Sequence, residues 1–133
     1  MLRRRNRLND ETGSELVEFA LAGLLFFTVL FGIMEFGRAV WTYGTAAHAA
    51  REGARYAIVR GSESGRAASA GDVANYVQGM ATGITEMTVT TTWQPDNNPG
   101  SVVQVRVDCP FRPVLPMIPS ITLTSTSRMV ISF

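Results

Sequence analysis

The feature that most constrains this chain is an apolar run near its N-terminus. From Phe19 to Met34 there is no charged residue, and Thr28 is the only polar one. With its apolar flanks the run reaches about 20 residues, the length that a membrane-spanning helix needs. A core helix of a soluble protein is the alternative, but a chain of 133 residues has little else to enclose a helix that is apolar on every side. The run therefore predicts one transmembrane helix.

The charges around this run predict its orientation. Four basic residues precede it: Arg3, Arg4, Arg5 and Arg7. Positive charge is enriched on the cytoplasmic flank of membrane helices, so we expect the N-terminus in the cytoplasm and the C-terminal part exported.

Two interpretations of the membrane segment stay open at this point. The first is a secretory signal peptide, for which Ala47-His48-Ala49 would be a small-residue cleavage site. The product would be a secreted binding domain that begins at Ala50. The second is a retained anchor that is cut on the cytoplasmic side or not at all. The apolar run is long for a signal peptide, and Glu35 and Arg38 lie between it and the cleavage site.

Glu18 is an acidic residue at the start of the apolar run. A carboxylate at the centre of a bilayer costs about 2.5–3.5 kcal/mol, and less near the interface. One interpretation is a residue at headgroup depth that reaches water. The other is a carboxylate that later pairs with a positive charge, because pairing offsets the cost of burial. A signal peptide gains nothing from such a residue.

The residues around Glu18 carry a resemblance. Gly13 followed by the letters SELVE resembles the cleavage motif of type IV prepilins. The resemblance implies that a prepilin peptidase cuts after Gly13 and that Ser14 becomes the N-terminus. It also implies that Glu18, the fifth residue of the mature chain, meets the N-terminal amine of a neighbouring subunit during assembly.

Four segments narrow the resemblance to one family. In order along the chain, ELVEFAL, MEFGR, HAAREGARYA and LTSTSRMVI are similar to the TadE-like family, the pseudopilins or minor pilins of the tight-adherence (Tad, Flp-type) pilus system. The middle of the chain, about Gly61 to Asn98, has no such motif. Phe19 stands where major Flp pilins tend to have Tyr, and the chain is longer than a major Flp pilin, which favours the minor type.

The resemblance implies a role and a location. It implies a structural subunit of the bacterial inner membrane that acts in pilus assembly, and hence in surface adhesion, and that can enter the pilus. The implied partners are the prepilin peptidase, other pilin or minor pilin subunits, and inner-membrane lipid.

The helix is expected to continue beyond the membrane to about Arg60, because residues 39–60 are rich in Ala and contain no Pro. Two adjacent rows of small residues lie on this extension. They are Ala46, Ala50 and Ala54, and Ala49, Gly53 and Ala57. Small residues at this spacing let another backbone approach closely. The partner is either the sheet of the same chain or another subunit.

A short helix and three strands are predicted in the C-terminal part. We expect Asp72 as the N-cap of the helix, with Val73, Tyr76, Val77 and Met80 on one face. The strands are expected at 86–93, 103–109 and 121–133, because apolar and polar residues alternate there. In the second strand the inward face is Val103, Val105, Val107 and Cys109.

The second and third predicted strands are joined by a proline-containing connector. Its prolines recur at every third position: Pro110, Pro113, Pro116 and Pro119. This spacing predicts an extended polyproline II segment. Phe111, Leu115 and Ile118 are expected to pack on the domain.

These elements predict an α+β fold of pilin type, a long N-terminal helix followed by a small antiparallel sheet. The expected segments are a leader at 1–13, a transmembrane helix at 14–37, a helical extension at 38–60 and an exported domain at 61–133. A net charge of +1 and the absence of an arginine cluster interleaved with aromatics give no case for nucleic acid. No catalytic or phosphate-binding motif stands out, so we expect neither an enzyme nor a cofactor or metal.

Overall fold

The computed structural model describes residues 6–132, with side chains from Thr12 onward. It contains, in chain order, α1 (Asn6–Ile58), α2 (Ala70–Met80), β1 (Thr88–Gln94), β2 (Val102–Phe111) and β3 (Ile121–Val130). The strands form one antiparallel sheet in the order β1-β2-β3. A long apolar helix followed by a small antiparallel sheet confirms the predicted α+β class.

The chain divides into two compact units within α1. The N-terminal unit is Met1–Gly37 and the C-terminal unit is Arg38–Phe133. The predicted helix end at Arg60 is two residues late, since α1 ends at Ile58. The carbonyl of Ile58 accepts a hydrogen bond from the Ser132 amide at 3.1 Å, which pairs one of the carbonyls left open at the end of the helix.

The described residues of the N-terminal unit form one helix, and none of them belongs to the hydrophobic core cluster. The described part of α1, Thr12–Ile58, is long and apolar enough to cross a membrane, and none of its most apolar eighteen residues is buried in the protein. The one polar side chain of the apolar run is satisfied within the helix, because the Thr28 hydroxyl donates to the carbonyl of Leu24 at 2.7 Å. A polar group paired in this way suits a helix in lipid, where no water is at hand.

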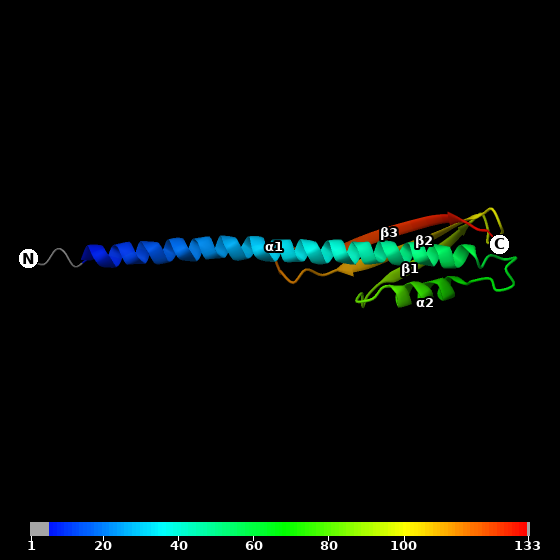
Figure 1. Ribbon diagram of the computed structural model, residues 1–133, viewed down its shortest axis with the longest axis horizontal. Helices are drawn as coiled ribbons and strands as arrows, with labels where there is room; N and C mark the ends of the chain where they lie inside the picture. The colour runs from blue at the N-terminus through cyan, green and yellow to red at the C-terminus, as the bar shows by residue number, and fades with distance from the viewer. Residues whose placement is uncertain (1–5, 133) are drawn as a thin grey trace, which may run out of the picture. The chain divides into compact units, whose positions relative to one another are not determined.

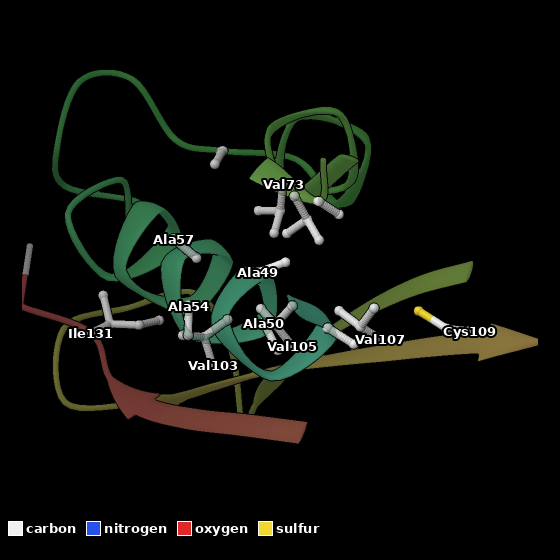
Figure 2. Packing of buried hydrophobic residues seen from close by; sticks show 14 residues of the cluster. Ala49, Ala50, Ala54, Ala57, Val73, Val103, Val105, Val107, Cys109 and Ile131 are labelled. Atoms are coloured by element: carbon white, nitrogen blue, oxygen red, sulfur yellow. The ribbon is translucent and has the colours of Figure 1, made fainter. Parts of the chain in front are cut away.

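The core of the C-terminal unit lies between α1, α2 and the sheet (Figure 2). As predicted, Val103, Val105, Val107 and Cys109 of β2 are fully buried. Val73 and Val77 of α2 face the same core, and Ile131 covers the end of the sheet. The alternation of β2 produces this core, because successive side chains of a strand point to opposite faces.

The start of α2 differs from the prediction. Ser69, not Asp72, is the N-cap, and its hydroxyl accepts a hydrogen bond from the Asp72 amide at 3.2 Å. The Asp72 carboxylate in turn accepts one from the Ser69 amide at 2.9 Å. The two residues form a capping box, in which a carboxylate three positions after the cap completes the motif. Met80, expected on the buried face, is 39% exposed because it is the last residue of the helix.

The connector between β2 and β3 also differs from the prediction. Pro110 and Phe111 belong to β2 itself. The amide of Ile118 donates to the carbonyl of Leu115 at 3.2 Å, so a turn interrupts the segment. A polyproline II helix has no internal hydrogen bonds, and the prediction of one continuous extended connector is therefore wrong. Phe111 is buried as expected, but Ile118 is exposed.

Candidate processing and assembly segment

The predicted cleavage site lies inside α1. Gly13 and Ser14 are both helical and exposed, and a Cβ built at Gly13 would have no neighbouring atom within 4 Å. A peptide bond in a helix is engaged in the i→i−4 hydrogen-bond ladder, so a peptidase acting here has to unwind this turn. Glycine makes that step easier by about 1 kcal/mol relative to alanine.

Glu18 lies one turn further along the same helix and is exposed. Its neighbours Leu16, Val17 and Phe19 expose most of their apolar surface. In the part of the chain that the structure describes, the side chain of Glu18 makes no hydrogen bond or ion pair. An apolar surface that surrounds a lone carboxylate needs lipid or other helices to cover it and a cation to pair with the acid.

The spacing of Ser14 and Glu18 gives this segment its possible chemistry. Residues four apart lie on the same face of a helix, separated by a rise of about 6 Å. A chain that begins at Ser14 has a positively charged amine at the helix N-terminus, where the open N–H groups and the helix dipole are also positive. Cleavage after Gly13 would therefore place this cation one helical turn from the Glu18 carboxylate of the same chain.

The structure places both rows of small residues against the chain's own domain. Ala46, Ala49, Ala50, Ala54 and Ala57 are 0–1% exposed. Figure 2 shows those of them that it labels between α2 and the sheet. Of the two partners left open by the sequence, the covering partner in this structure is the sheet of the same chain together with α2.

Gly53 is the point of closest approach in these rows. A Cβ built there would collide with Cγ2 of Val77 and lie 3.3 Å from Cγ1 of Val105. The missing side chain lets α1 approach α2 and β2 at the same time, which is the packing role that small-residue rows allow.

The signal-peptide interpretation conflicts with this core. The A-x-A site at Ala47-His48-Ala49 lies in the middle of α1, and Ala49 is fully buried. Cleavage after Ala49 would remove Ala46 and Ala49 from the core and truncate the helix that the sheet covers. The buried position of the site favours a retained helix.

The comparison with protein families agrees with this segment. The family model described as TadE-like protein matches residues 13–55. Over this range the chain is similar to the TadE-like family. The match confirms the resemblance predicted from ELVEFAL, MEFGR and HAAREGARYA, and it associates the protein with Tad pili. No curated protein and no solved structure matches the chain.

The extent of the TadE-like match follows the structure closely. It begins at Gly13 and includes Glu18, the apolar run and the small residues from Ala46 to Ala54. The three strands lie outside it. The matched part is therefore α1, while the sheet that covers its C-terminal half is not part of the family model.

The sequence did not single out one further cluster, at the end of the C-terminal unit where α1 enters it. The Arg38 guanidinium lies 5.3 Å from the centre of the Phe111 ring. Arg38 and Arg112 line the same hollow of about 220 Å³, and Arg112 pairs with Glu86 at 3.2 Å. Arg38, Glu86 and the adjacent residues Phe111 and Arg112 come from three distant parts of the chain, so no local spacing could have predicted that they meet.

Proposed function

We propose that this TadE-like protein is a minor pilin or pseudopilin of a Tad pilus, stored in the bacterial inner membrane and processed after Gly13. Its N-terminus faces the cytoplasm and its C-terminal unit is exported. Its role is structural rather than enzymatic, in pilus assembly and hence in surface adhesion. The partners in this proposal are prepilin peptidase, other pilin or minor pilin subunits and membrane lipid.

One observation carries the proposal. Glu18 is an exposed carboxylate without a partner in the described chain, on an apolar helix and one turn after the Gly13–Ser14 bond. An anchor that only tethers a domain is better without this residue, because a carboxylate in lipid is costly. A subunit that must recognise a newly made amine on a neighbour gains from it.

The energetics of assembly follow from the part of α1 that the rest of the protein does not cover. Its apolar side chains are covered by lipid before assembly and by like helices afterwards, so the hydrophobic contribution changes little. Packing and the contact between Glu18 and the amine are then left to set the register between subunits. The small-residue rows of α1 are occupied within the chain and contribute no such contact in this structure.

The N-terminus of the protein isolated from cells tests the processing step. Mass analysis should find Ser14 as the first residue, and Gly13→Leu should leave the leader attached. A chain that begins at Met1 would support a plain anchored binding domain, and one that begins at Ala50 would support a secreted one. Either result contradicts the proposal.

Glu15 provides a matched control for the assembly step, since it is also exposed and lies one turn from Glu18. Glu18→Ala should leave membrane insertion and processing intact but prevent incorporation into pili or reduce the number of pili. Glu15→Ala should behave like the unchanged protein. Equal pilus number and composition in both variants would remove the assembly role of Glu18.

A further inference from the structure

The connector between β2 and β3 presents apolar side chains to solvent. Met117 is 92% exposed and Val114 is 76% exposed, and Ile118 is 42% exposed. Single exposed apolar residues are ordinary, but three within five positions of one connector form a patch. None of the three is needed for the fully buried core, which consists of other residues. The exposed apolar surface of this patch is therefore available for contact with a partner outside the C-terminal unit.

The base of this connector is fixed to the point where α1 leaves the apolar run. Phe111, the last residue of β2, is buried and contacts Arg38. Arg38 is the first residue of the C-terminal unit and lies four residues after Met34, the last residue of the run. In Figure 1 the connector, in orange, lies at the end of the C-terminal unit at which α1 enters it. Because Arg38 follows the run by only four residues, the proposed anchoring would bring Arg38 close to the membrane surface.

The charges and aromatics beside the patch suit a lipid surface. Arg38 and Arg112 line one hollow, and the side chain of Arg112 is 74% exposed. Its ion pair with Glu86 is also exposed, and such pairs are weak enough to rearrange. Trp41 and Tyr43 are exposed on the next turn of α1. Arginine beside exposed apolar and aromatic residues is the pattern of segments that lie in a membrane interface.

We propose that the connector docks on the outer surface of the membrane that α1 crosses. Val114, Met117 and Ile118 enter the boundary between headgroups and acyl chains, and Arg38 and Arg112 bind lipid phosphates. The inference rests on the proposed anchoring by α1. Docking would hold the C-terminal unit against the bilayer while the subunit is stored, and extraction into a filament would release it.

The depth of residue 117 in a bilayer tests the docking. The full chain is reconstituted in vesicles of phosphatidylethanolamine with a minority of phosphatidylglycerol, and Met117→Cys carries an environment-sensitive fluorophore. We expect a blue-shifted emission and severalfold stronger quenching by lipid spin-labelled near the headgroup than for Thr92→Cys, a position on the exposed face of β1. The unsubstituted protein gives the background from buried Cys109.

A third labelled position separates this inference from the proposed anchor. Leu25→Cys lies near the middle of the apolar run and should be quenched by lipid spin-labelled deep in the acyl chain, whether or not the connector docks. Quenching at residue 25 but not at residue 117 would overturn the docking and leave the anchor intact. Absence of quenching at residue 25 would overturn both. A blue shift at residue 117 without lipid quenching would mean that protein covers the patch, which also contradicts docking.

The arginines have their own test in the same vesicles. Arg112→Gln in the Met117→Cys background should reduce quenching at residue 117 in vesicles with phosphatidylglycerol. The difference in quenching at residue 117 between vesicles with phosphatidylglycerol and purely zwitterionic vesicles should be smaller in the Arg112→Gln variant than without this substitution. An unchanged difference would remove the phosphate-binding role of Arg112.

Discussion

Replacing Gly53 by alanine adds one methyl group at the closest approach of α1 to α2 and β2. The new Cβ would collide with Cγ2 of Val77 and lie 3.3 Å from Cγ1 of Val105. Val77 is fully buried, and a β-branched side chain has little rotamer freedom with which to move away. The substitution therefore overpacks a closed core.

The magnitude of this effect can be separated from helix propensity with a matched control. Gly44 lies in the same helix, and a Cβ there would meet no atom within 4 Å. Both glycine-to-alanine changes gain about 1 kcal/mol of helix propensity. Overpacking at Gly53 adds a cost of about 1–3 kcal/mol. Gly44→Ala should therefore stabilise the protein, and Gly53→Ala should be less stable than Gly44→Ala by about 1–3 kcal/mol.

The measurement is thermal or urea unfolding of the full chain in detergent, followed by near-ultraviolet circular dichroism. For a unit of this size, 1 kcal/mol corresponds to about 4–8 °C in Tm. Val77→Ala removes the methyl group in the collision, so it should cost less in the Gly53→Ala background than alone, by the coupling that neighbouring sites show. Equal stability of the two alanine variants, together with purely additive effects of Val77→Ala, would refute the close packing at Gly53.

Three further predictions concern the C-terminal unit. Ser69→Ala should destabilise it by about 1 kcal/mol through loss of the N-cap of α2, with faster amide exchange in that helix as the readout. The pKa of Asp72 is lowered mainly by the hydrogen bond from the Ser69 hydroxyl and secondarily by the hydrogen bond from the Ser69 amide. These bonds therefore stabilise the folded state above the ordinary aspartate pKa, and this stabilisation is lost as the pH falls through the lowered pKa. Acid titration of unfolding should therefore show a smaller decrease in stability for Ser69→Ala than for the unchanged protein, and equal decreases would contradict the capping box. Burial, and secondarily the charge of Asp108, raise the pKa of the Cys109 thiol. A maleimide should therefore label Cys109 only after denaturation. Rapid labelling of the folded protein would contradict the buried position of Cys109.

Local patterns were sufficient for the order of helices and strands and for the buried face of β2. The alternation in β2 predicted the inward set Val103, Val105, Val107 and Cys109, and all four are fully buried. The uncharged run predicted a membrane-spanning helix, and the most apolar part of α1 is not buried in the protein. The distance between Gly13 and Glu18 along the chain follows from the rise per residue of a helix alone. These features follow from residues near one another in the chain, so no tertiary contact was needed to recognise them.

Tertiary structure decided what covers each face. The small-residue rows indicated close packing, but only the fold shows that α2 and the sheet of the same chain cover Ala46 and Ala50. Asp72 has the residue type of a cap, yet the path of the chain into α2 makes Ser69 the cap. Ile118 looks apolar enough for the core, but the turn in the connector leaves it exposed. Periodicity determines which side of an element is apolar, whereas its partner depends on contacts between distant residues, as between Arg38 and Phe111, and such contacts form only when the whole unit packs.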